Sequence, residues 1–271
     1  MALTLDKSKL EKYFTRIGLV YADYESKPRD FKMLCELQLA HVTTIPYENL
    51  DIIRKIPLSL DEEALYAKII DNHRGGYCFE VNGLYGSMLR ALGFGVTDYF
   101  ARYLRGETGI PMRRHRVLKV EAADETFMCD IGIGQPAPRY PVKMAVGLHQ
   151  PQFGETYKFE KEDFFGWVLY DLHNGSWRKT FSFTEEEQVA IDYAAASTWC
   201  ELHPDSPFNK DVMMAIKTVS GRKSIDGRTF KIFNSITNES ENVDVKENLN
   251  DDDIKQILAE HFGINYDAIF N

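Results

Sequence analysis

The sequence predicts an α+β protein built from an N-terminal helical bundle, a central antiparallel β-barrel-like sheet and a C-terminal α/β lid. Apolar residues recur at helical spacing up to about residue 93, and from residue 94 the apolar period changes to two. A short segment with both patterns follows residue 200. We therefore expect the bundle over residues 1–93, the barrel with a connecting helix over 94–200, and the lid over 201–271.

Four helices are expected in the first third of the chain. Residues that share one face of the first helix are Leu10, Tyr13, Phe14 and Ile17. The second helix runs from about Asp30 to Val42, and capping-box spacing at 59–62 opens the third. The fourth helix begins at Cys78 and ends at Gly93.

Alternation of apolar and polar residues predicts strands at 96–104, 115–121, 126–131, 156–160, 166–173 and 176–183. Asn174-Gly175, between the last two, is a strong signal for a two-residue hairpin turn. Thr184-Glu185-Glu186-Glu187 has capping-box spacing, so we expect a helix from there to about Trp199.

The last segment is expected to hold strands at 211–219, 222–226 and 228–233, with a turn at Asp226-Gly227. The polar stretch 238–247 is interpreted as a mobile connector. A final helix is expected to begin at Asn250 and to stop at Gly263.

Composition and charge argue against several classes of protein. The 271-residue chain has a formal net charge of −9, which disfavours nucleic acid as a partner because phosphate recognition needs a basic face. No apolar run approaches the roughly 18 residues of a membrane span, and the charged first residues are unlike a signal peptide. The four cysteines contain no C-x-x-C pair, so we expect neither a zinc site nor a disulfide framework. These features predict a soluble, cytoplasmic protein without a metal.

Cys78 lies where a helix is expected to begin, after two glycines that let the chain turn sharply. Backbone N–H groups at a helix N-terminus stabilise a thiolate, and they can also hold an oxyanion formed at an attacked carbonyl. The alternative is a small buried core residue that follows glycines ending the preceding helix. The other cysteines, expected mid-helix, mid-strand and past a helix end, are interpreted as structural: Cys35, Cys129 and Cys200.

His115 begins one expected strand and Asp130 ends the next. A hairpin centred between residues 122 and 123 would place the two side chains opposite each other on one face, with Cβ atoms about 4.5–5.5 Å apart. A slip of one residue would leave them diagonal, about 7–8 Å apart and still within reach. The pair is either the base and orienting carboxylate that a thiolate nucleophile needs or an ordinary cross-strand surface pair.

Four motifs, in matching order and spacing, resemble those of the arylamine N-acetyltransferases. Arg74-Gly75-Gly76-Tyr77-Cys78-Phe79-Glu80-Val81-Asn82 is similar to the cysteine-containing signature of that family, and residues 41–50 are similar to its H-x-x-x-I-P-F-E-N-L segment. Residues 115–120 match its H-x-x-L-x-V strand. Residues 130–136 resemble its D-V-G-F-G-x run, which is followed by prolines.

The resemblance implies a papain-like enzyme core with Cys78 as nucleophile, His115 as base and acid, and Asp130 as the orienting group. It also implies ping-pong transfer of acetyl from acetyl-CoA to an arylamine, an arylhydrazine or an N-hydroxyarylamine through a thioester on Cys78. The C-terminal lid would keep water out. Tyr47, where the family usually has Phe, and Phe79 are expected to contact the acceptor.

Candidates for CoA contacts, chosen for basic charge or for small size, are Arg113, Arg114, Arg222, Lys223, Gly132 and Gly134. In a chain of net negative charge, a local basic cluster is needed to hold a polyanion. The alternative is that the four basic residues are solvated strand-edge positions. The two glycines would let the backbone approach the pantetheine arm, or they mark only a turn.

Two other functions fit the same residues less well. A papain-like cysteine hydrolase or a transglutaminase-like amide exchanger would use the triad without CoA, but residues 41–51 and the C-terminal segment fit the acetyltransferase pattern better. A non-catalytic binding protein is disfavoured because Cys78, His115 and Asp130 are all intact.

Overall fold

The first third of the chain is helical in the structure, a computed structural model that describes residues 5–234 and 242–267. Its helices are α1 (Lys7–Arg16), α2 (Phe31–Thr44), α3 (Leu50–Ile53), α4 (Glu62–Tyr66) and α5 (Cys78–Ala91). A π-helical turn, Ala67–Asp71, continues α4. Asp61 caps α4 by accepting backbone hydrogen bonds, so the capping residue expected at Ser59 is wrong by two positions.

The central part is an antiparallel sheet of eight strands that curls into a nearly closed barrel. The strands are β2 (Gly95–Tyr103), β3 (His115–Ala122), β4 (Glu125–Cys129), β5 (Val142–Lys143), β6 (Gln150–Gln152), β7 (Glu155–Glu162), β8 (Gly166–His173) and β9 (Ser176–Gln188). Their order, β5-β4-β3-β2-β9-β8-β7-β6, leaves two short strands at the edges. Asn174 and Gly175 both have positive φ and form the predicted hairpin turn.

Two glutamine side chains bridge the seam between these edges. The Gln150 amide accepts a hydrogen bond from the Lys143 N–H at 2.7 Å and donates one to the Lys143 carbonyl at 3.0 Å. Gln152 bonds the Tyr140 backbone in the same two ways, at 2.6 and 3.1 Å. Because these amides satisfy backbone groups at the seam, the barrel offers fewer unpaired edge groups to another chain.

The helix expected from Thr184 does not form there, because residues 184–187 continue β9. On either side of this stretch β9 pairs with β2, with Tyr99 opposite Glu187 and Ala101 opposite Phe183, and residues 184–186 lie at the irregularity between these two pairs. A 3₁₀ turn, Ala190–Tyr193, precedes α6 (Ala194–Leu202). Cys200 therefore lies inside a helix instead of past its end.

The C-terminal segment forms a second sheet that includes a strand from the N-terminal part. Its order is β1-β10-β11-β12-β13, with β1 (Tyr47–Glu48), β10 (Met213–Thr218), β11 (Gly221–Asp226), β12 (Thr229–Asn234) and β13 (Asn242–Lys246). The expected connector 238–247 thus holds an edge strand, while its first residues lie outside the described ones. Helix α7 (Asp251–Phe262) follows, with Asn250 and Gly263 as its caps.

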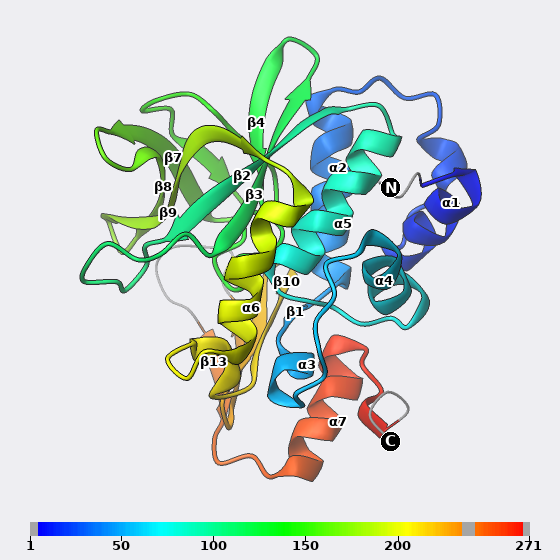
Figure 1. Cartoon of the computed structure of the whole chain (residues 1–271), viewed down its shortest axis with the longest axis vertical. Coiled ribbons are helices and arrows are strands. Elements are labelled where there is room, and N and C mark those ends of the chain that lie inside the picture. Colours follow the sequence, from blue (N-terminus) through cyan, green and yellow to red (C-terminus); the bar gives the residue numbers. More distant parts are fainter. Residues whose placement is uncertain (1–4, 235–241, 268–271) are drawn as a thin grey trace.

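The three parts of the chain meet around the N-terminus of α5. Figure 1 shows α5 beside β2 and β3 of the barrel, with the C-terminal sheet and α7 below. An apolar cluster there combines residues from all three parts, including Tyr77, Phe79, Tyr193 and Phe208. Within the described residues, no helix has the length and apolarity needed to cross a membrane.

Candidate active site

Cys78 lies in the first turn of α5, after two glycines that allow close backbone contact. A Cβ atom on Gly75 would lie 1.9 Å from the Pro46 carbonyl oxygen, and one on Gly76 would lie 2.8 Å from Glu80 Oε2. Neither glycine has a positive φ. The glycines therefore serve packing against Pro46 and Glu80, and not the sharp turn expected from the sequence.

Buried charges fix the segment that precedes α5. The Arg74 guanidinium lies 2.8 Å from Glu48 and 2.7 Å from Asp51. The Lys68 ammonium joins Asp51 to Glu80, at 2.7 Å from each carboxylate. Because an interior charge is tolerated only with partners, this network holds the backbone before Cys78 in one arrangement.

His115 and Asp130 are in direct contact: Nε2 of the imidazole lies 2.6 Å from Oδ2 of the carboxylate. Ala122 pairs with Glu125, so the hairpin is centred between residues 123 and 124, which is the second of the two registers considered. In this slipped register the two residues are diagonal and share a face. Asp130 directly follows β4, so its backbone is not held by the pairing of β3 with β4 and its side chain can turn toward the imidazole.

Asn82, one turn after Cys78 on α5, holds the Asp130 carboxylate. Its Nδ2 donates to Asp130 Oδ1 at 2.9 Å, and its Oδ1 accepts from the Ile131 N–H at 3.0 Å. The Gly132 N–H donates to the same carboxylate oxygen at 2.9 Å. Helix α5 therefore carries the candidate nucleophile together with the side chain that positions the carboxylate behind its base.

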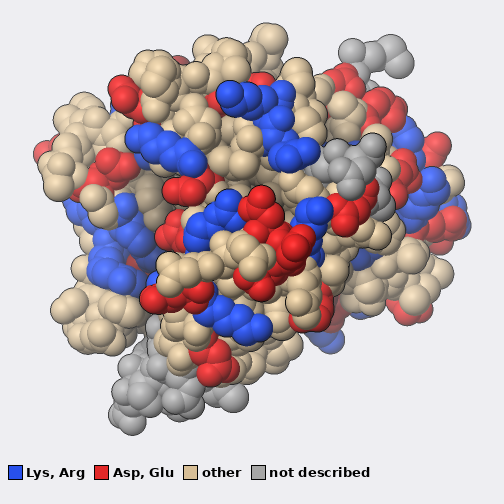
Figure 2. All heavy atoms as spheres, turned by 90° about the horizontal axis from the view of Figure 1, so that it is seen from below, with Lys and Arg blue, Asp and Glu red and all other residues tan. Residues whose placement is uncertain are grey.

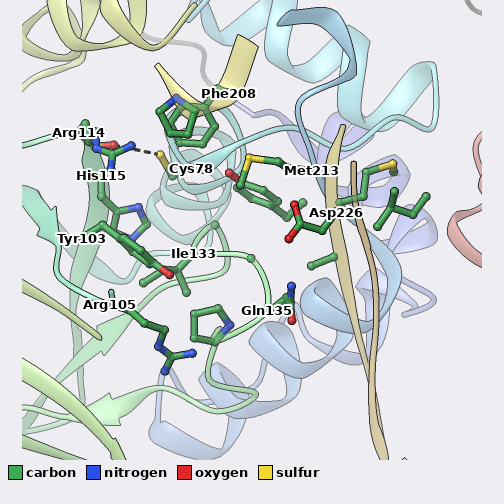
Figure 3. Close-up of a pocket in the computed structure, with 18 of the residues that line it drawn as sticks. Cys78, Tyr103, Arg105, Arg114, His115, Ile133, Gln135, Phe208, Met213 and Asp226 are labelled. Carbon is green, nitrogen blue, oxygen red and sulfur yellow. Dashed lines mark hydrogen bonds between the residues drawn. The ribbon is translucent and has the colours of Figure 1, made fainter. Parts of the chain in front are cut away.

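The surroundings of His115 favour its protonated form. Burial opposes the charged imidazole, but the Asp130 carboxylate and the Cys78 side chain outweigh burial and raise the pKa of His115 to about 10. Figure 3 shows His115 and the Cys78 sulfur at the same end of a cavity. A protonated imidazole beside a cysteine at a helix N-terminus favours a thiolate–imidazolium pair.

The cavity has a volume of about 430 Å³ and receives walls from all three parts of the chain. Tyr103 comes from the end of β2 and Arg105 from the turn after it. Residues 132–136 follow β4, and β10 and β11 close the other side (Figure 3). Phe208 and Asp226 contribute an aromatic ring and a carboxylate. A mostly apolar cavity with a few polar groups suits a small aromatic molecule.

Comparison with known proteins assigns the chain to a family. A sequence model of a family described as N-acetyltransferase matches residues 30–270. Arylamine N-acetyltransferase of Mycolicibacterium smegmatis is 34% identical over 232 residues, which is 82% of each chain. The chain belongs to the arylamine N-acetyltransferase family.

Two further proteins support the assignment. An arylamine N-acetyltransferase / N-hydroxyarylamine O-acetyltransferase of Salmonella typhimurium is 31% identical over 217 residues, 80% of this chain and 75% of its own. The solved structure of the Mycobacterium marinum arylamine N-acetyltransferase in complex with CoA is 27% identical. It superposes with a TM-score of 0.87 over 97% of this chain and 95% of its own. The predicted α+β fold and family are therefore confirmed.

Of the two residues expected to contact the acceptor in this acetyltransferase, one lines the cavity and the other does not. Tyr47 lines the cavity, and burial raises the pKa of its hydroxyl well above the usual value, so the hydroxyl stays neutral. Phe79 is fully buried, with its ring centroid 5.4 Å from that of Tyr77 and 6.0 Å from that of Phe100. It is not among the residues that line the cavity, and it supports the site by packing where we expected contact with the acceptor.

Some of the residues expected to contact CoA line a cavity and others do not. Those that line the cavity are Gly132, Gly134 and Arg114. Arg222 lines a smaller cavity that adjoins it. Arg113 lines neither and pairs with Glu186 at 3.1 Å, and the Lys223 ammonium, also outside both, lies 3.3 Å from the His261 ring. Figure 2 shows Lys and Arg interspersed with Asp and Glu on one face, without a continuous basic surface.

The remaining cysteines of the acetyltransferase are poor thiolate candidates. Burial raises the pKa of Cys35 and of Cys200 to about 12, and it raises that of Cys129 well above the usual value. All four cysteines are unpaired. In the described part of the chain, no group of three or more His, Cys, Asp or Glu side chains is placed to hold a metal ion.

Sequence reasoning missed several residues that line the cavity: Tyr103, Arg105, Phe208, Met213 and Asp226. One available signal was alternation along β2, which places positions 101 and 103 on one face, whereas Arg105 lies in the turn after the strand. Alternation alone does not show which face of the strand lines the cavity. It therefore identifies the residues that share a face, but not that they line the cavity.

Gly132 is expected to be intolerant of a side chain. A Cβ atom there would lie 2.7 Å from Cys78 Cα and 2.9 Å from Val81 Cγ2, so alanine would push the loop from the start of α5. We expect Gly132→Ala to lower the free energy of unfolding by about 1–3 kcal/mol, measured by urea denaturation, because overpacking costs this much. Gly109→Ala is the matched control, since its Cβ would meet nothing within 4 Å. Equal losses in both variants would contradict this account.

Proposed function

We propose that the protein transfers the acetyl group of acetyl-CoA to the nitrogen of arylamines, arylhydrazines or N-hydroxyarylamines, through a thioester on Cys78. The observation that carries this proposal is the position of Cys78 at the start of α5 and at one end of the cavity, with His115 beside it. Asp130 holds the imidazole through Nε2. The names of the related proteins describe transfer to the nitrogen of arylamines and, in one of them, to the oxygen of N-hydroxyarylamines.

In the first half-reaction, the Cys78 thiolate attacks the carbonyl carbon of the acetyl thioester. Backbone N–H groups at the start of α5, where the side chain of the N-cap residue Tyr77 makes no capping hydrogen bond, stabilise the negative oxygen that develops. As the bond from carbon to the CoA sulfur breaks, the protonated His115 gives its proton to that sulfur. CoA leaves as a thiol, and the acetyl group remains on Cys78 beside a neutral imidazole.

In the second half-reaction, the nitrogen of the acceptor attacks the acetyl carbonyl on Cys78. The neutral His115 accepts the proton that the nitrogen loses, and the Cys78 sulfur leaves as a thiolate. This restores the thiolate–imidazolium pair. The weakly nucleophilic nitrogen of the acceptor therefore attacks a thioester, which is more reactive than an ester or an amide.

We assign a lid role to the C-terminal unit, residues 201–271, over units 1–93 and 94–200. The Phe208 ring lies 5.7 Å from that of Tyr77, next to Cys78 in sequence, and Met213 and Asp226 line the cavity (Figure 3). Side chains from this unit cover the thioester and keep water from hydrolysing it. The four unpaired thiols suit a reducing compartment, and we place the enzyme in the cytoplasm.

Incubation with acetyl-CoA alone tests the proposal. We expect one acetyl group on the protein, detected by intact-mass analysis and located at Cys78 by peptide mapping. Adding an arylamine should remove the group and release the acetylated amine. If no adduct forms until amine is present, the ping-pong scheme is wrong. Turnover of glutamine-containing peptides without CoA would favour the amide-exchange alternative instead.

A further inference from the structure

A second cavity, of about 270 Å³, adjoins the active-site cavity on the side away from Cys78. The two share Arg105, Gln135 and Pro136. Figure 3 shows Arg105 and Gln135 at the opposite side of the active-site cavity from Cys78. The second cavity is mostly polar, and three arginines line it: Arg105, Arg178 and Arg222.

Two of these arginines share a single carboxylate. Arg105 and Arg178 both pair with Asp171, Arg178 at 2.7 Å. Burial would raise the pKa of Asp171, but the two guanidiniums outweigh it and lower the pKa, so the carboxylate stays ionised. The Nε–H groups of both arginines have no acceptor among the described residues. The cluster thus has more donors than acceptors.

The other carboxylate of this cavity is already occupied. Glu155 accepts from Arg139 at 2.6 Å and from Lys217 at 2.7 Å, both of them buried. Together with the pair on Asp171, four cationic side chains meet two carboxylates. Arg222 also lines this cavity, and its Nε–H donates to Gln135 Oε1 at 3.4 Å. In a chain with a net charge of −9, this is a local positive site that can attract an anion.

We propose that the small cavity binds the phosphate groups of the CoA donor, with Arg105, Arg178 and Arg222 as their partners. This inference rests on the proposed function. In acetyl-CoA the thioester and the phosphates lie at opposite ends of the flexible pantetheine arm. If the phosphates bind beside Arg105, the arm can extend along residues 132–136 and bring the thioester to Cys78. Guanidinium groups suit this task because they bind phosphate oxygens through paired N–H donors.

Arg178 can be tested against its neighbour, Lys179. Both lie on β9 and point to opposite faces of the sheet. They are equally exposed, at 39% and 40%, and each pairs with one carboxylate, Asp171 or Glu162. Arg178→Gln and Lys179→Gln therefore remove the same charge at the same exposure, but only the first alters the small cavity.

The measurement is the ratio of kcat/KM for acetyl-CoA to kcat/KM for S-acetylpantetheine, which carries no phosphate. We expect this ratio to fall about 10- to 100-fold in Arg178→Gln and in Arg222→Gln, as loss of a hydrogen bond to a charged group implies. It should stay at the wild-type value in Lys179→Gln. Acetyl-dephospho-CoA, which lacks the 3′-phosphate, then shows which phosphate the arginines hold. High salt should weaken the wild-type preference for acetyl-CoA.

Failure of this inference can be told apart from failure of the proposed function. If the wild type forms no Cys78 adduct with any of the three donors, the proposed function is wrong. If adducts form but the ratio is unchanged in both arginine variants, the phosphate site is overturned. Adduct formation from S-acetylpantetheine also shows that each variant is folded, so a misfolded protein is not mistaken for support.

Discussion

Replacing Cys78 with alanine is expected to lower kcat/KM for arylamine acetylation by at least about 10⁴-fold, as loss of a nucleophile does in other triads. Without the sulfur, no thioester forms, and His115 has no thiol with which to exchange a proton. The measurement is chromatographic quantification of acetylated amine at fixed acetyl-CoA, together with intact mass after acetyl-CoA alone. We expect neither product nor adduct.

The matched control is Cys35→Ala. Cys35 is half-buried in α2 and its thiol has a raised pKa, so its loss should leave both the rate and the adduct near wild-type values. Cys78→Ser separates chemistry from folding, because a hydroxyl fills nearly the same space but is a much poorer nucleophile. Retained acetylation in Cys78→Ala would show that another group carries the acetyl, and would remove the basis of the mechanism.

Elements that depend on residues close together in the sequence could be predicted. Elements that depend on pairing with a distant strand were predicted less well. Asp30 capped the expected helix, and Asn174-Gly175 formed the expected turn, because both signals act within a few residues. Thr184 did not open a helix, because β9 continues through it and pairs with β2 on both sides of it, at Phe183 and at Glu187. The strand that begins at residue 242 was missed for the same reason: its polar residues form a ladder with β12.

The candidate site shows the same division. The hairpin pattern between residues 115 and 130 was enough to propose contact between His115 and Asp130, because either register would have allowed it. The resemblance to the family supplied the link to Cys78. Phe79 follows Cys78 in sequence, but the helix turns its ring into the core, an orientation that adjacency to Cys78 does not reveal. The pairing of Arg105 with Asp171 joins the turn after β2 to β8, and no local pattern in the sequence relates those residues.

Replacing Asp130 with asparagine is expected to lower kcat/KM by about 10³- to 10⁴-fold, the scale of the corresponding loss in a serine-protease triad. The amide would still accept from Asn82 and from the Gly132 N–H through Oδ1. Its NH₂ would then face His115 Nε2 and force the neutral ring to carry its proton on Nδ1. In that tautomer Nδ1 already carries a proton, so it cannot accept one from the Cys78 thiol. Asp124→Asn, an exposed change in the same hairpin, is the control.

The same variant changes how stability depends on pH. In the wild type the pKa of His115 is raised from 6.5 to about 10, so the folded protein holds this proton more tightly than the unfolded chain. The resulting stabilisation is complete below about pH 6.5 and is lost as the pH rises through about 10. Asp130→Asn lacks the carboxylate that holds the proton, so its free energy of unfolding should fall less steeply over this range.

Urea denaturation between about pH 6.5 and 10, on the wild type and both asparagine variants, measures this difference. Parallel declines in all three proteins would show that Asp130 does not hold the proton. A steeper decline in the wild type and in Asp124→Asn than in Asp130→Asn would place the proton on His115 in the resting enzyme. That is the proton which the CoA sulfur must receive when acetyl moves to Cys78, so a stability measurement would then bear directly on the first chemical step.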